Sequence, residues 1–433
     1  MSNIDPLLAP IQALAALPKG TSTRAAYERL SEALVTVFPA LRSRSPENVD
    51  RFAIQSALSN AVRATGLPDN SGGGVTAESV ATAICDAVTA TDAKRVYLCP
   101  LNYGAELLPR KFGPCEVQKF SQSELEAELQ IARLKRQTPQ LRLDTKLLSL
   151  FQWLVVRETV LLPERIGQRS VPMFYRIAGQ DYGEINPHAS TWPRAVEEAA
   201  FALLLLPWED LVRDPNVDWR PFRIPWVYTS EHDPFVRLAT PEDADSLALE
   251  PFGYEDPKTG EWDEWEVPMR TELAGNKNDA IVPLTDQRWN EITSALHLPA
   301  FNQRVVHFLV RAFATDGIDE FLAHAITIEA ALGRPEDFHG STRPRIGRQN
   351  PGATERVARR VEAILSDASA YRDYKELFDL RSKFVHGSCL AKIPSETRLK
   401  ARRLARRVAD ALVSAASSTT YQDRNAFLSA LCP

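Results

Sequence analysis

The sequence predicts a multidomain α+β protein with a helical N-terminal part, a mixed α+β middle part and an all-helical C-terminal part. Three observations predict this class. Apolar residues recur at helical spacing over the first ninety residues, short strand-like runs begin near Lys94, and helical spacing returns after residue 285. A length of 433 residues also favours more than one domain. We place the parts at residues 1–92, 93–284 and 285–433.

The N-terminal part is predicted to be helical. The segments "TRAAYERLSEALVTVFPAL" and "NVDRFAIQSALSNAVRATG" repeat apolar residues three and four positions apart. The glycine-rich stretch "DNSGGG" at 69–74 follows, and no Gly-Lys-Ser/Thr comes after it, so a linker is favoured over a phosphate-binding loop. Thr76 is then the expected N-cap of another helix.

The middle part alternates between strand and helix patterns. The runs "RVYLCPL" and "CEVQKF" predict strands, and Ser121 with Glu124 forms a capping box that opens the helix "SELEAELQIARLKRQ". The apolar segment "RAVEEAAFALLLL" predicts a further helix. Residues 207–283 are rich in Trp, Pro, Asp and Glu, which predicts strands and long loops without assignable chemistry.

The C-terminal part is expected to form a helical bundle in which each helix buries one apolar stripe. A proline-, glycine- and arginine-rich loop at 333–352 cannot be helical throughout and interrupts the series. The expected helices cover residues 285–296, 302–315, 318–332, 355–385 and 396–417.

Composition excludes several classes. No apolar run is long enough to cross a bilayer, and the N-terminus lacks the pattern of a secretion signal, so a cytoplasmic protein without membrane contact is expected. The five cysteines are scattered, without disulfide-framework or zinc-site spacing. The formal charge of −5 hides an asymmetry, because residues 334–407 carry 18 Lys and Arg against 9 Asp and Glu. Local basicity of this kind can mark an anionic partner.

One short stretch, "YKELFDLRSKFVHGS", carries a candidate site. It contains Arg381, four intervening residues, His386 and then Gly387. Together with "HAITIEAALG" and "TERVARRVEAIL", it resembles the HEPN superfamily, specifically the Apea-like HEPN branch. Ser382 departs from the pattern, because several members have a larger polar residue there. The resemblance covers about residues 285–433 and implies a HEPN four-helix bundle that acts as a metal-independent endoribonuclease and is active as a dimer.

The two residue types suit RNA cleavage on chemical grounds. RNA carries its own nucleophile, the 2′-hydroxyl, so an enzyme must move protons and stabilise charge on the phosphate. His386 is the candidate general acid/base, because histidine titrates near neutrality. Arg381 is the candidate phosphate clamp, because its planar fork binds two oxygens and keeps its charge. Neither a metal nor another cofactor is expected.

A homodimer is expected because one arginine and one histidine supply only half of what acid and base catalysis requires. Five residues on a helix also separate their directions by roughly 140°. A two-fold axis near the helix end would bring both pairs to one cleft. Gly387 is expected to end the helix and leave His386 at the solvent edge.

Each of the other candidate residues has two possible roles, one functional and one structural. Glu329 either orients Arg381 or is an exposed helix residue, and Lys383 either contacts a phosphate or is solvated. Two basic sets either bind the RNA backbone or form ordinary solvated faces. They are Arg343, Arg345 and Arg348 in the loop, and Arg402, Arg403 and Arg406 on the last helix.

The expected function is a ribonuclease toxin or anti-phage defence effector that its N-terminal region regulates. The expected partners are RNA, a second copy of the chain, and a phage or antitoxin protein as trigger. One alternative is a non-catalytic HEPN module that dimerises or binds RNA. Another is an enzyme in the N-terminal half, which would require a pocket with convergent polar groups in residues 95–283.

Overall fold

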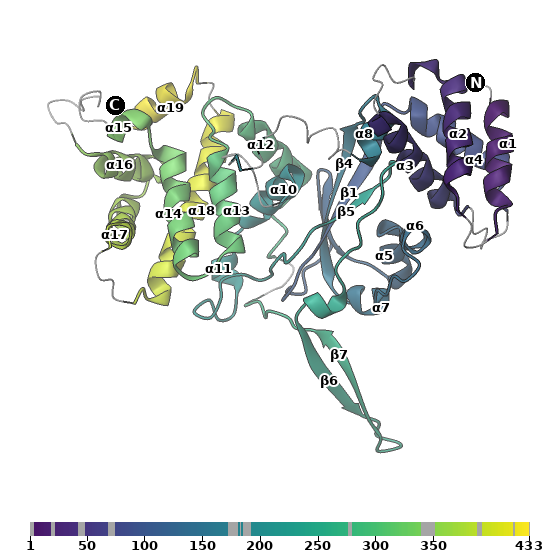
Figure 1. Ribbon diagram of the computed structural model, residues 1–433. Coiled ribbons are helices and arrows are strands. Elements are labelled where there is room, and N and C mark those ends of the chain that lie inside the picture. The colour runs from purple at the N-terminus through teal and green to yellow at the C-terminus, as the bar shows by residue number, and fades with distance from the viewer. Residues whose placement is uncertain are drawn as a thin grey trace.

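The computed structural model describes residues 4–18, 22–41, 48–67, 74–171, 181, 183–184, 192–275, 279–338, 351–387, 392–418 and 421–432. Three parts follow one another across the molecule: a group of N-terminal helices, a β-sheet and a larger helical body (Figure 1). The fold is mixed α+β with helical N- and C-terminal parts, as predicted. Among the described helices, none combines the length and the apolar character needed to cross a membrane.

The N-terminal helices form their own buried cluster. It also takes in Ile166 and Phe235 from the middle part. Thr76 caps the fourth helix as predicted, and its hydroxyl accepts a hydrogen bond from the Ser79 N–H at 3.2 Å. The helices are α1 (Asp5–Ala15), α2 (Arg24–Val37), α3 (Asn48–Thr65) and α4 (Ala77–Thr89), with α8 (Ile166–Ser170) against α3.

The central sheet has five antiparallel strands in the order β2-β3-β4-β1-β5. Its two central strands pair over their whole length, from Asp92 opposite Leu161 to Pro100 opposite Trp153. The strands are β1 (Asp92–Pro100), β2 (Arg110–Phe112), β3 (Cys115–Lys119), β4 (Gln152–Leu161) and β5 (Tyr228–Glu231). A separate hairpin of β6 (Leu249–Glu255) and β7 (Trp262–Pro268) projects from this region (Figure 1).

Both faces of the sheet are buried, as the alternation of side chains along a strand allows. Tyr97 and Cys99 of β1 face the helical body, whereas Val96 and Leu98 face three short helices. These helices are α5 (Gln122–Glu128), α6 (Ile131–Gln137) and α7 (Thr145–Leu148). The single helix predicted after Ser121 is therefore two helices, and the chain breaks where Gln130 adopts a left-handed conformation with φ of 53°.

The helical body contains more helices than predicted. The expected helix over 355–385 is divided, because Ser366 is left-handed with φ of 50° and Asp367 caps a new helix by accepting from the Ser369 N–H at 3.0 Å. The helices are α10 (Arg194–Leu204), α11 (Trp208–Leu211), α12 (Asp286–Leu296), α13 (Arg304–Ala314), α14 (Gly317–Leu332), α15 (Pro335–Phe338), α16 (Ala353–Leu365), α17 (Ala368–Val385), α18 (Ser395–Ser418) and α19 (Arg424–Leu431).

The predicted boundary between residues 284 and 285 falls inside one buried cluster. Helix α10 packs against α13, and α11 packs against α18. Phe201 and Trp208 of these two helices share that cluster with Leu309 of α13 and Val408 of α18. Two helices from the middle of the sequence thus belong to the C-terminal helical body.

A buried polar contact fastens the segment after α11 to α14. The indole N–H of Trp219 donates to Glu320 Oε1 at 2.6 Å, and Arg220 Nη2 donates to Glu320 Oε2 at 3.1 Å. The Glu320 side chain is 0% exposed and that of Arg220 only 2%. Burial raises the pKa of the Glu320 carboxyl, and the charge of Arg220 opposes the rise.

We predict that Glu320→Ala destabilises the protein strongly. The substitution leaves the buried Arg220 guanidinium and Trp219 N–H without this acceptor, and breaking a buried pair costs about 3–5 kcal/mol. Urea unfolding followed by tryptophan fluorescence measures the loss.

The matched control is Asp316→Ala. Asp316 also pairs with Arg220, at 2.6 Å, but its side chain is 62% exposed. Removing an exposed partner costs about 1 kcal/mol or less. Equal losses in the two variants would contradict the role given to Glu320.

Candidate functional site

The predicted catalytic histidine lies at the exposed end of α17. This helix begins at the Asp367 cap and buries Ala370, Tyr374 and Leu377. It ends at Val385, where the His386 N–H donates to the Ser382 carbonyl at 3.0 Å. Gly387 follows with φ of 70°, the left-handed conformation that favours glycine after a helix.

The His386 side chain is exposed and forms no hydrogen bond or ion pair with the described residues. The predicted helix end and solvent-edge position of His386 are therefore confirmed. A free imidazole at a helix end can accept or donate a proton to a molecule that docks there.

Arg381 lies one turn before this end and points toward α14. Its Nη2 lies 3.7 Å from Glu329 Oε2, and its guanidinium carbon lies 5.8 Å from the centre of the Phe378 ring. The Arg381 side chain is 27% exposed and that of Glu329 is 17% exposed. A separation of 3.7 Å exceeds hydrogen-bond length, so Glu329 holds Arg381 by charge rather than by a bidentate fork.

A partly buried polar group stands behind the guanidinium. Glu329 Oε1, the Tyr374 hydroxyl and Arg381 Nε are buried, and none finds a hydrogen-bond partner among the described residues. Burial raises the pKa of the Glu329 carboxyl, and the Arg381 charge opposes that shift. Burial also raises the pKa of Tyr374 well above its usual value, and the Glu329 charge adds to it. The Arg381 charge opposes both shifts.

The remaining residues of the last turn face solvent. The Lys383 ammonium lies 3.6 Å from the Asp379 carboxylate, and the Lys383 side chain is 55% exposed. Phe384 and Val385 are also exposed, at 42% and 53%. Within the described residues Arg381 faces Glu329 of α14, whereas the His386 side chain faces solvent.

The prediction that Arg402 binds RNA is wrong, because this side chain is 0% exposed. Its Nη2 donates to the Leu204 carbonyl at 2.6 Å, its Nε lies 3.4 Å from Glu209 Oε2, and its guanidinium stacks over Trp219 at 4.3 Å. Burial lowers the pKa of Arg402 to about 10, against the opposing charge of Glu209. Arg402 therefore holds α18 to α11.

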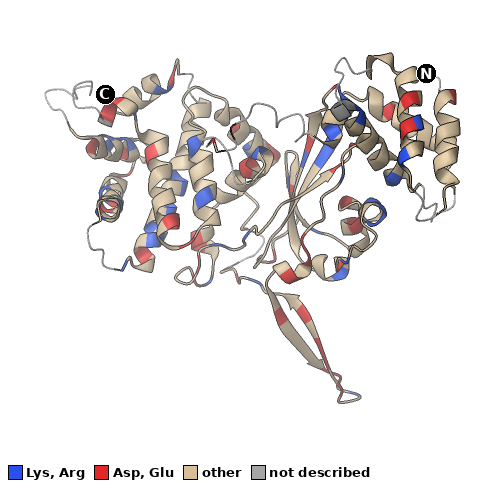
Figure 2. Cartoon of the chain, in the orientation of Figure 1, with Lys and Arg blue, Asp and Glu red and all other residues tan. Residues whose placement is uncertain are grey.

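Two further arginines of the predicted RNA track also pair with α11. Arg406 Nε donates to Glu209 Oε1 at 2.7 Å and its side chain is 12% exposed, whereas Arg403 pairs with Asp210 at 2.6 Å and remains 45% exposed. Figure 2 shows acidic and basic residues mixed over the helical body. The arginines of α18 that were predicted to bind RNA therefore pair with carboxylates of the same chain. Arg343, Arg345 and Arg348 lie outside the described residues.

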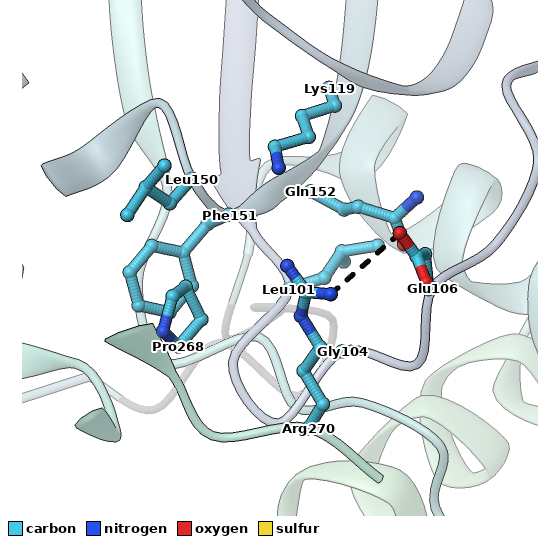
Figure 3. Close-up of a pocket in the computed structure, with 9 residues that line it drawn as sticks. All are labelled: Leu101, Gly104, Glu106, Lys119, Leu150, Phe151, Gln152, Pro268 and Arg270. Atoms are coloured by element: carbon cyan, nitrogen blue, oxygen red, sulfur yellow. Dashed lines mark ion pairs between the residues drawn. The ribbon is translucent and has the colours of Figure 1, made fainter. Parts of the chain in front are cut away.

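The middle part contains a small pocket at the end of the sheet (Figure 3). Lys119 and Arg270 enter it from opposite sides, and Arg270 lies 3.7 Å from Glu106. The Gln152 side-chain amide accepts a hydrogen bond from the Leu107 N–H and donates one to the Leu107 carbonyl. The lining contains no serine, cysteine or histidine, so it holds no nucleophile and base of the hydrolase type. It consists of Leu101, Gly104, Glu106, Lys119, Leu150, Phe151, Gln152, Pro268 and Arg270.

The described residues bring no three His, Cys, Asp or Glu side chains together in a way that could hold a metal ion. No family model, curated protein or solved structure matches the chain. The likeness to HEPN proteins therefore depends on the motif residues of the sequence alone.

Sequence reasoning missed the link between Arg381 and two other residues of α17, Tyr374 and Phe378. Both lie on the face of α17 that carries Arg381, seven and three residues earlier. That spacing was the available signal. The position of α14 decides between the two interpretations of Glu329, because it places this carboxylate beside Arg381 with only 17% of the side chain exposed.

We predict that Arg402→Ala lowers the free energy of unfolding much more than Arg403→Ala does, although the two residues are adjacent. Arg402→Ala leaves Glu209 buried with one partner fewer and should cost roughly 3 kcal/mol of unfolding free energy. Arg403→Ala removes an exposed pair and should cost about 1 kcal/mol or less. Chemical unfolding measures both free energies. Similar small losses in the two variants would contradict the buried structural role of Arg402.

Proposed function

We propose that this protein is a metal-independent endoribonuclease of the HEPN type. In this proposal RNA is cut by attack of its own 2′-hydroxyl, with His386 as general acid/base and Arg381 as phosphate clamp. The single observation that carries it is the geometry at the end of α17, where an exposed imidazole without a partner among the described residues follows an arginine held by Glu329. The exposed imidazole would supply proton transfer, and the partly buried guanidinium five residues before it would supply charge stabilisation.

The active unit in this proposal is a homodimer. Each chain offers one imidazole and one guanidinium, whereas the reaction needs a base for the 2′-oxygen and an acid for the 5′-oxygen. A two-fold axis beside the end of α17 would bring two copies of both groups together. Phe384 and Val385 support this arrangement, because exposed apolar side chains beside His386 would be covered in such a contact.

A second candidate is a non-catalytic HEPN module that dimerises or binds RNA. One observation favours it, since the Arg381 side chain is only 27% exposed and already faces a carboxylate. A phosphate must then compete with Glu329 for the guanidinium. Comparing cleavage with binding distinguishes the two functions.

We predict that His386→Ala lowers the RNA cleavage rate by about 10²–10⁴-fold, the usual share of a general acid or base. Arg381→Ala should lower it by about 10²–10³-fold, as expected for loss of a charge-stabilising group. Labelled RNA is followed in the presence of EDTA, and the products should end in 2′,3′-cyclic phosphate.

The control for this assay is Arg372→Ala, which removes an exposed arginine of α17 away from the site and should leave the rate unchanged. RNA binding measured on the His386 variant should remain. Cleavage that survives both site substitutions would exclude this site, and binding without cleavage in the unmodified chain would favour the non-catalytic module.

We further propose that the N-terminal region restrains this nuclease in the cell and responds to a phage or antitoxin protein. Helices α1–α4 support a separable unit, because they form a buried cluster distinct from that of the helical body. Restraint is expected because an unregulated ribonuclease would destroy the RNA of its own cell.

We predict that a chain beginning at Asp92 cleaves RNA faster than the full chain does. Removal of α1–α4 would release the restraint while leaving the sheet and the helical body. Both proteins are compared at equal concentration, with circular dichroism as the check of folding. A folded truncated chain that is no faster would overturn the proposed restraint.

A further inference from the structure

The β6–β7 hairpin stands apart from the cores of the molecule. Its two strands pair only with each other, from Leu249 opposite Pro268 to Glu255 opposite Trp262. Figure 1 shows it extending away from the rest of the chain. The turn is closed by the Gly260 N–H, which donates to the Asp256 carbonyl at 2.8 Å.

The register of this hairpin gathers aromatic rings on one side. Phe252 lies opposite Trp265, and Tyr254 lies two residues further along the same face. We call Phe252, Tyr254 and Trp265 the aromatic face. Trp262 lies on the other side over Gly253, where a Cβ would come within 2.0 Å of its ring.

The aromatic face is open to solvent. Phe252, Tyr254 and Trp265 are 49%, 50% and 46% exposed, and none belongs to a buried cluster of the described chain. The Phe252 and Trp265 rings contact each other with centroids 5.1 Å apart, which stabilises the hairpin but covers only part of each ring. Clustered exposed aromatic side chains are typical of protein interaction sites.

The hairpin is also strongly acidic. Residues 249–268 contain seven Asp and Glu against one Lys, a net charge of −6. Not one of these carboxylates forms an ion pair within the part of the chain that the structure describes. Figure 2 shows acidic residues on both strands. The charge is therefore available to an outside partner.

We propose that the aromatic face is a docking site for a segment of another protein that combines apolar side chains with Lys or Arg. The rings would anchor the apolar side chains, and the carboxylates would attract and orient the cations. Nucleic acid and anionic membrane surfaces are repelled by the same carboxylates.

Helix α18 of a second copy is a poor match for the hairpin, because Lys400, Arg402, Arg403, Arg406 and Arg407 already pair with carboxylates. The proposed docking site does not depend on the ribonuclease proposal. Its test measures binding and needs no RNA.

The test uses the full chain and three labelled peptides of equal length as probes. One peptide combines Leu and Lys, one combines Ser and Lys, and one combines Leu and Glu. Fluorescence anisotropy should detect binding of the Leu/Lys peptide alone, and added salt should weaken it by screening the carboxylates. Equal binding of the Ser/Lys peptide, or no binding of the Leu/Lys peptide, overturns the proposal.

Matched variants locate the contact on the aromatic face. Trp265→Thr should weaken Leu/Lys binding by roughly tenfold or more, whereas Trp262→Thr, on the other face of the same strand, should change it little. Threonine retains strand propensity in both cases. Equal effects of the two substitutions contradict the assignment of the binding face.

A further control tests whether the hairpin variants lose binding only because they misfold. In this control a short Gly/Ser link replaces residues 250–267. This chain should keep the melting temperature of the full chain and lose peptide binding. Retained binding overturns the proposal. Sedimentation of the unmodified and Trp265→Thr chains distinguishes a second copy as occupant, because loss of an oligomer in the variant would also overturn it.

Discussion

The arrangement of the helical body depends on two buried carboxylates that hold arginines from other elements. Glu320 of α14 accepts from Arg220, and Glu209 of α11 pairs with Arg402 of α18. A buried charge without its partner costs several kcal/mol, so the segment 208–224 cannot leave the helices without that loss. These contacts make the end of the middle part and the C-terminal helices one structural unit.

The candidate site is linked to this unit through α14. The same helix carries Glu320 at its first turn and Glu329 near its last, so the element fastened to Arg220 also positions Arg381. Helix α17 has a second attachment, because its Asp367 cap pairs with Arg407 of α18 at 2.9 Å. A shift of α14 against α17 would change the distance between Glu329 and Arg381 and hence how strongly the carboxylate competes with a phosphate.

The sequence predicted features that local chemistry determines. Periodicity and capping gave the Thr76 cap, the helix end at Gly387 and the extent of α14 and α18. The helix breaks at Gln130 and Ser366 were missed because non-glycine residues there adopt left-handed conformations, which leave little trace in composition. The place of α10 in the helical body was missed because it depends on contacts between distant segments.

Arginines show most clearly why local patterns stop short of function. The run "KARRLARR" fits a solvated face, an RNA track or a buried ion pair equally well, and Glu209, nearly two hundred residues away, decides that Arg402 is buried. The net charge of a segment is an equally poor guide to its partners, because charged side chains that form ion pairs within the chain are not available to a partner. On α18 the carboxylates of α11 and α17 pair with the basic residues, whereas none of the seven carboxylates of the β6–β7 hairpin forms an ion pair with another described residue. The described chain thus offers a partner an acidic hairpin, although composition had directed attention to a basic helix.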